Sequence, residues 1–161
     1  MPYYSHVAEG WTPVAHADGA SALANNSYQA VRAASALNAI KIVEIYVAGE
    51  AGASGVNRII LRRASTNAGT PTNQAPGPIA PFSAAAAAQG YVAATTGPTI
   101  ASTQHLCELT LNAFGGVVTW RPLTAGAEVI AVTATAPNAE LVLDSISGTN
   151  IVSTGIKFEE L

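Results

Sequence analysis

The second half of the chain alternates apolar and polar residues with a period of two, and this pattern decides the fold class. Residues 105–113 read HLCELTLNA, which places Cys107, Leu109 and Leu111 on one side of the segment and polar residues on the other. Successive side chains of a β-strand point to opposite faces, so this segment is predicted to be a half-buried strand. Further strands are predicted at residues 41–48, 56–63, 117–123, 128–136, within 137–150, and at 151–161.

Glycine-rich turns such as residues 49–55 and 114–116 separate these segments, and no helical period of useful length appears. About seven or eight strands joined by short turns predict an all-β chain, an antiparallel β-sandwich or a jelly-roll-like domain. The length of 161 residues fits a single domain. We expect an extended arm at residues 1–27 and the β-sandwich at residues 28–161.

Two segments at the start of the sandwich carry more detailed expectations. Residues 28–40 are rich enough in alanine for a short helix, but they also fit a strand leading into the next segment, which we favour slightly. In the strand at 41–48, Val43, Ile45 and Val47 are expected on one face. The side chains of Ile42, Glu44 and Tyr46 are expected on the other face.

The predicted arm is rich in glycine, proline, serine and asparagine, yet it carries large aromatic residues. Tyr3, Tyr4 and Trp11 are the candidates for anchors against another protein, because aromatic side chains dominate interface energetics. The alternative is that these side chains fold back onto the core of their own chain.

The predicted loop at residues 64–104 belongs to a longer stretch, 64–107, that has no Lys, Arg, Asp or Glu. Its prolines exclude a regular ladder or helix, and its run of alanines at 84–88 favours one or two helical turns only if they pack against something. Ile79 and Phe82 distinguish it from a flexible linker. We therefore expect a covered loop, packed on its own sheet or on a neighbouring subunit, with Ile79 and Phe82 as contact residues.

Charged residues make up 11% of the chain, against about 25% in a typical soluble domain. Such a scarcity favours a surface covered by partners over an ordinary alanine-rich domain. The net charge of −3 and the seven basic residues argue against binding to nucleic acid or to an anionic membrane surface. Arg58 and Arg62 share one face of the strand at 56–63 and are either salt-bridge partners of a second subunit or residues of a solvated strand edge.

No constellation of residues indicates catalysis, a metal site or a cofactor. The lone Cys107 cannot form an intrachain disulfide and is expected to be a small buried hydrophobe; the alternative is a nucleophile with His105 as its base. His6 and His16 are expected to be solvated loop residues rather than metal ligands. The start of the chain lacks the features of a secretory signal, so we expect synthesis in the cytoplasm.

The layout of the chain resembles a family of known proteins. The segment KIVEIYVAGEAGASGVNRIILRRAS, the uncharged Pro/Ala-rich loop, the late VVTWRPLTAGAEVIAV and the closing TGIKFEEL are similar to small virion proteins of tailed bacteriophages, the capsid decoration or cement proteins. The similarity spans roughly residues 30–161 and concerns layout rather than a tight motif. It implies a small β-sandwich, often a symmetric oligomer, that binds the outer face of an icosahedral shell and carries no catalytic residues.

We therefore expect a non-enzymatic virion structural protein, located on the capsid surface and without cofactors. Its expected partners are the major capsid protein and further copies of itself, as a homodimer or homotrimer. The alternative is a carbohydrate- or receptor-binding β-sandwich of a phage tail or fibre, and a small hydrolase is a third class that lacks any motif. The candidate interface residues are Tyr3, Tyr4, Trp11, Arg58, Arg62, Ile79 and Phe82.

Overall fold

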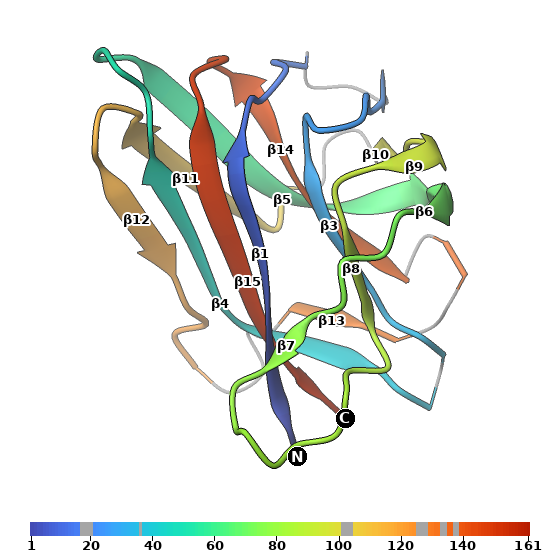
Figure 1. The fold of residues 1–161 in the computed structure, drawn as a ribbon. Helices are drawn as coiled ribbons and strands as arrows, with labels where there is room; N and C mark the ends of the chain where they lie inside the picture. Colours follow the sequence, from blue (N-terminus) through green and yellow to red (C-terminus); the bar gives the residue numbers. More distant parts are fainter. Residues whose placement is uncertain (17–20, 36, 101–104, 125–128, 133–134, 137–138) are drawn as a thin grey trace.

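Two large antiparallel sheets pack against each other, which confirms the predicted all-β sandwich (Figure 1). The computed structural model describes residues 1–16, 21–35, 37–100, 105–124, 129–132, 135–136 and 139–161. Parts of the predicted turn at 124–128 and of the predicted strand at 128–136 lie outside these residues. The described part contains strands and turns and no helix.

The first sheet joins the two ends of the chain. Its order is β12 (Val117–Trp120), β4 (Ile40–Gly49), β15 (Val152–Glu160), β1 (Tyr3–Trp11) and β7 (Gly77–Pro78), with β13 (Val129–Ala131) also paired to β4. Figure 1 shows β1 and β15 side by side along their length, in blue and red. The register runs from Tyr3 opposite Glu159 to Trp11 opposite Val152.

The second sheet is centred on β5 (Val56–Thr66) and β14 (Glu140–Ser147). Its order is β2 (Ser21–Ala22), β10 (Thr99–Ile100), β5, β14, β3 (Gln29–Arg32) and β8 (Gln89–Tyr91), with β11 (Cys107–Asn112) also paired to β5. A separate small pair consists of β6 (Gly69–Pro71) and β9 (Ala94–Thr96). The predicted preference for a strand within residues 28–40 is thus met by β3 at its beginning.

The core lies between the two sheets and contains the alternating residues that the sequence indicates. In β11, Cys107, Leu109 and Leu111 are buried, whereas the residues between them are exposed. Ile59 and Leu61 of β5 belong to the same fully buried cluster. Each such side chain contributes about 1.5–3 kcal/mol by leaving water, so the sandwich is held mainly by these inward-facing positions.

The predicted faces of β4 are wrong for its first half. Ile42 and Ile45 both belong to the core cluster, although a regular strand would place them on opposite faces. The register between β15 and β4 shifts between Lys157 and Phe158, which pair with Glu44 and Ile42 respectively, so Val43 is the extra residue of a bulge. A bulge inserts one residue and exchanges the two faces of the strand beyond it.

The beginning of the chain is not the extended arm that the sequence predicts. Residues 3–11 form β1, and Tyr4 and Trp11 are 1% and 4% exposed in the core of their own chain. The Tyr4 ring stacks on Phe158 with ring centroids 5.8 Å apart, and Trp11 Nε1 donates a hydrogen bond to Thr154 Oγ1 at 2.8 Å. Of the two alternatives for these aromatics, folding back onto the core is therefore correct for Tyr4 and Trp11.

The uncharged stretch differs from the expectation in three ways. The alanine run at 84–88 forms no helix, and most of residues 72–85 are exposed rather than covered by their own sheets. The predicted loop at 64–104 also contains short paired strands, which run from the end of β5 to β10. Residues 101–104 of this loop lie outside the described part. Five alanines cannot nucleate a helix without packing, and here only Ala88 is buried and Ala86 partly packs on the core.

Candidate protein-interaction site

One end of the sandwich gathers exposed apolar side chains from segments far apart in sequence. Phe82 is 100% exposed, Ile79 53% and Tyr3 45%, and Leu161 is also exposed. Figure 1 shows both termini and the turn after β7 at this end. We call Tyr3, Ile79, Phe82 and Leu161 the apolar end, and three of its members are predicted interface residues.

Hydrogen bonds hold the turn that presents Phe82. Ile79 N–H donates to Tyr3 O at 2.9 Å, and Ser83 N–H donates to Ala80 O at 3.0 Å, which closes the turn around Phe82. The Tyr4 hydroxyl reaches out of the core and donates to Ala84 O at 3.0 Å. The benzyl side chain of Phe82 is thus held away from the core by a fixed backbone.

Glu160 fixes the other side of the same end. Its Oε1 accepts a hydrogen bond from Ala88 N–H at 2.7 Å, and Leu161 N–H donates to Ala39 O at 2.9 Å. Burial, with a smaller effect from the charge of Glu160, raises the pKa of Tyr4 above its ordinary value. The Tyr4 hydroxyl therefore stays protonated near neutral pH and remains the donor to Ala84.

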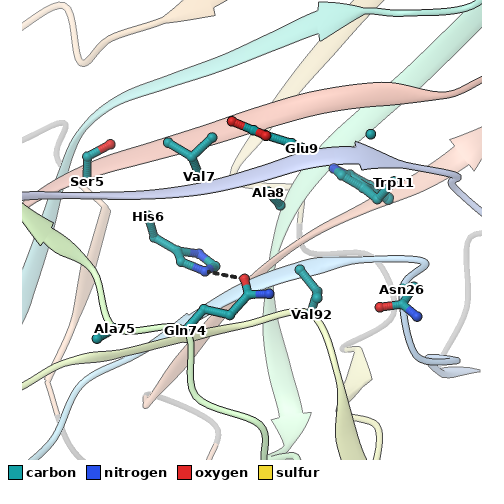
Figure 2. A pocket seen from close by; sticks show the side chains of 11 residues that line it. Ser5, His6, Val7, Ala8, Glu9, Trp11, Asn26, Gln74, Ala75 and Val92 are labelled. Carbon is teal, nitrogen blue, oxygen red and sulfur yellow. Dashed lines mark hydrogen bonds between the residues drawn. The ribbon is translucent and has the colours of Figure 1, made fainter.

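A hollow of about 520 Å³ lies between β1 and the segment that leads into β7, and we call it the wedge. Its walls are residues 5–11 on one side and Asn26, Gln74, Ala75 and Val92 on the other. Figure 2 shows His6 and Gln74 pointing toward each other across it, while Val7 and Glu9 point to the other face of β1. Sequence reasoning missed the wedge, because its walls come together only through the pairing of distant strands.

His6 is buried between two glutamines and is not the solvated residue that the sequence predicts. Gln29 Nε2 lies 3.1 Å from His6 Nδ1, and His6 Nε2 lies 3.2 Å from Gln74 Oε1. An amide nitrogen only donates, so Nδ1 accepts and the proton of the neutral ring is on Nε2. Burial lowers the pKa of His6 below its ordinary value, and the hydrogen bond to Gln74 opposes this only in part.

The predicted arginine sites lie on the second sheet, away from the apolar end. Arg58 forms a salt bridge with Glu108 of β11 at 2.6 Å, with both side chains partly exposed. Arg62 is fully buried and lies 3.3 Å from the equally buried Asp144. Burial raises the pKa of Asp144 to about 6, and the charge of Arg62 opposes part of this rise. The expectation that Arg62 bridges to another subunit is wrong, because its partner is within the chain.

A second buried ionic network is structural. Glu140 Oε2 accepts from Arg32 at 2.6 Å, and the same guanidinium donates to Ala68 O at 2.7 Å. The guanidinium also lies over the ring of Tyr91, 5.4 Å from its centroid. These contacts tie the residue before β6 to β3 and β14.

Glu44 is the third ionic centre and lies on the first sheet. It accepts hydrogen bonds from Lys157 and, at 2.6 Å, from Arg121 Nε. The hydrogen bond from Lys157 and, less strongly, the one from Arg121 lower the pKa of Glu44 against the opposing effect of burial. A shallow hollow of about 560 Å³ adjoins Arg121 and is lined by Thr119, Trp120 and Leu123, which places a second apolar surface beside β12.

The described residues bear on two kinds of chemistry that the sequence raised, a metal centre and a Cys107 nucleophile. Within this part of the chain, no three His, Cys, Asp or Glu side chains are grouped so that they could hold a metal ion. Cys107 is buried, and burial raises the pKa of its thiol to about 11, so the thiolate nucleophile is not formed near neutral pH. None of the described segments forms a helix with the length and apolarity that crossing a membrane requires.

No protein-family model matches the chain, and no curated protein matches it. The case for a function therefore rests on the surface of the sandwich, above all on the apolar end.

Proposed function

We propose that this chain is a capsid cement, or decoration, protein that binds the outer surface of a shell built from a major capsid protein. The observation that carries the proposal is the fully exposed Phe82 in an uncharged and mostly exposed segment, residues 72–85. Exposed apolar residues that cluster on a soluble protein mark interaction surfaces. The layout that resembles phage decoration proteins supports the same class.

The apolar end is suited to insertion into a pocket on a flat partner. Aromatic side chains that enter a pocket supply most of the energy in many interfaces. The backbone of the turn is already fixed by the bonds to Tyr3 and Ala80, so little conformational entropy is lost when Phe82 binds. We propose Phe82 and Ile79 as the shell contacts, in place of Tyr4 and Trp11.

The proposal includes self-association as a homodimer or homotrimer. Several weak contacts on one rigid oligomer then add up to a tight clamp across neighbouring capsomers, because each binding event after the first is intramolecular. Such a clamp reinforces the shell without chemistry, a cofactor or nucleic acid.

The experiment is co-sedimentation with shells of the major capsid protein encoded in the same genome. Wild-type protein is expected to sediment with the shells and to raise their melting temperature. Phe82→Ser is expected to stay in the supernatant while its own melting temperature is unchanged. The matched control is Phe114→Ser, since Phe114 is 61% exposed in the turn between β11 and β12, at the other end of the sandwich (Figure 1). Equal binding by wild type and Phe82→Ser would contradict the assignment.

The alternative, a carbohydrate-binding sandwich, has one observation in its favour. The side chains of Asn26 and Gln74 line the wedge, and such amide groups can bind sugar hydroxyls. Carbohydrate sites also use an exposed aromatic face, whereas Trp11 is buried and its ring nitrogen is bound to Thr154. A glycan array probed with wild type and Gln74→Ala separates the two functions, because only the carbohydrate function predicts a signal that the substitution removes.

A further inference from the structure

Backbone pairing of β1 on the side of the wedge ends after Ser5. Tyr3 O accepts from Ile79 N–H, and Ser5 lies opposite Gly77, so the odd-numbered residues of β1 direct their peptide groups toward β7. The even-numbered residues pair with β15, as the bond from Glu160 N–H to Pro2 O in the same register shows. The N–H and C=O groups of Val7 and the N–H of Glu9 therefore face the wedge.

The segment that could have paired with Val7 pairs elsewhere. Continued in the same register, β7 would place Ala75 opposite Val7. Instead, Gln74 N–H donates to Gly90 O at 2.6 Å and Thr72 N–H donates to Ala93 O at 2.8 Å, which carries residues 72–74 to the edge of the second sheet. The wedge is the space between β1 and this departing segment, and the contact of His6 with Gln74 spans it.

This edge has little of the protection that exposed strand edges usually carry. Residues 6–11 contain no proline and no lysine, two common means of blocking a further strand. The register shift between Ala8 and Trp11, with Gly10 at φ +58°, is a bulge that ends the regular ladder near Glu9. The unprotected length is therefore short, from Ser5 to Glu9.

The charge beside this edge selects its occupant. Glu9 is exposed, and Glu50 Oε2 lies 3.7 Å from the position that a Cβ on Gly10 would take. None of the residues that line the wedge is a lysine or an arginine. Val7 is 40% exposed on the same face as Glu9, so a strand added here would place one apolar and one basic side chain next to them.

We propose that the wedge binds an extended segment of a partner protein, which adds to β1 as a further strand with a lysine or arginine beside Glu9. The segment accepts hydrogen bonds from the N–H groups of Val7 and Glu9 and donates one to the C=O of Val7, and its inward side chains enter the hollow between Ala8 and Val92. Strand addition of this kind draws affinity from the main chain and specificity from alternate side chains. The proposal is independent of shell binding, which uses the apolar end.

The test begins with a selection on the purified full chain, so that no partner sequence has to be assumed. A displayed library of random decapeptides is selected for binding, and the enriched peptides are synthesised. We expect sequences free of proline that carry lysine or arginine and bind with the amides of Val7 and Glu9 newly protected from hydrogen exchange. N-methylation of alternate peptide amides removes the hydrogen-bond donors that face β1 and places methyl groups at that edge, and it is expected to abolish binding, although every side chain remains.

Charge reversal tests the role of Glu9 against a matched control. Glu9→Lys is expected to weaken binding of the selected peptides by about fivefold or more, and to favour versions with glutamate in place of the basic residue. Glu108→Lys reverses an exposed carboxylate on the second sheet and is expected to leave the affinity unchanged. Failure to enrich any peptide, binding that survives N-methylation, or equal effects of the two reversals would overturn the proposal, whereas the Phe82 experiment would be unaffected.

Discussion

His6 and Gly90 occupy adjoining space across the gap between the two sheets. A Cβ atom on Gly90 would lie 2.4 Å from Cδ2 and Cγ of His6, closer than carbon atoms approach in proteins. Gly90 belongs to β8 and His6 to β1, so this contact sets how near the second sheet comes to the open edge of the first. The imidazole ring is held by Gln29 and Gln74 and cannot turn aside without losing both bonds.

Gly90→Ala is therefore expected to destabilise the protein by about 1–3 kcal/mol, the usual cost of inserting a methyl group into filled space. Urea unfolding at neutral pH measures this change. Gly52→Ala is the control, because no atom lies within 4 Å of a Cβ at that position. His6→Ala combined with Gly90→Ala is expected to be less destabilised than the sum of the single variants, since the clash is then relieved. Additive effects would mean that the two residues do not compete for space.

The lowered pKa of His6 predicts a pH dependence of stability. The unfolded chain binds a proton at His6 near pH 6.5, whereas the folded chain resists it, so the free energy of unfolding decreases as pH falls below about 6.5. The raised pKa of Asp144, about 6, acts in the opposite direction, because the folded state then holds a proton that the unfolded state has released. The two effects overlap between about pH 4 and pH 6.

A difference measurement separates them. The stability of wild type minus that of His6→Gln is expected to decrease between pH 7.5 and pH 5.5, because the contribution of Asp144 is common to both proteins and cancels. Chemical unfolding at a series of pH values provides these numbers. A constant difference across this range would mean that the folded chain binds a proton at His6 as readily as the unfolded chain, which would contradict the lowered pKa of His6.

Glu44 is expected to matter more for stability than other partly accessible carboxylates. Glu44→Gln leaves Lys157 and Arg121 without their shared anion and is expected to cost about 1 kcal/mol at pH 7. The lowered pKa of Glu44 places the loss of this contribution below about pH 4.5, as the carboxylate is protonated. Glu108→Gln, which disrupts the more exposed pair with Arg58, is expected to change stability by less than about 0.5 kcal/mol. Thermal unfolding of both variants measures the two changes in stability.

Removal of residues 1–11 is expected to abolish cooperative folding. The deletion exposes the side of β15 that pairs with β1, and it takes away Tyr4 and Trp11, each of which contributes on the order of 3–5 kcal/mol when truncated in a core. Circular dichroism during heating is the measurement. A truncated protein that melts like the full chain would show that β1 is the detachable arm suggested by the sequence.

The local sequence pattern was sufficient to predict a strand and its buried face where apolar and polar residues alternate without interruption. The buried positions of β11 follow directly from its sequence, and the closing strand β15 was expected at residues 151–161. β4 was expected as a strand, but its faces depend on the bulge at Val43, which is fixed by the register with β15 and leaves no mark in the local sequence. Alternation alone therefore identifies strands more reliably than it identifies which side is buried.

The candidate site was only partly accessible to sequence reasoning. Ile79 and Phe82 could be singled out because they are apolar residues in a segment without charge, and both are exposed. Glycine, proline and serine in residues 1–27 concealed β1, although the even positions Tyr4, His6 and Ala8 are the ones that turn inward. The wedge could not be predicted, because it forms where residues 72–74 leave β1 and bond to the segment around Gly90. No periodicity in the sequence encodes this long-range pairing.

The pairing of β1 with β15 also determines when the first sheet can form during synthesis. Tyr3 lies opposite Glu159, so β1 can pair with β15 along its length only after residues 152–160, which are synthesised much later than β1, have emerged from the ribosome. Closing so long a loop makes folding slow, and until it closes β1 is an unpaired strand with a largely apolar inner face. During synthesis that strand is therefore open to pairing with another copy of the chain until β15 has emerged.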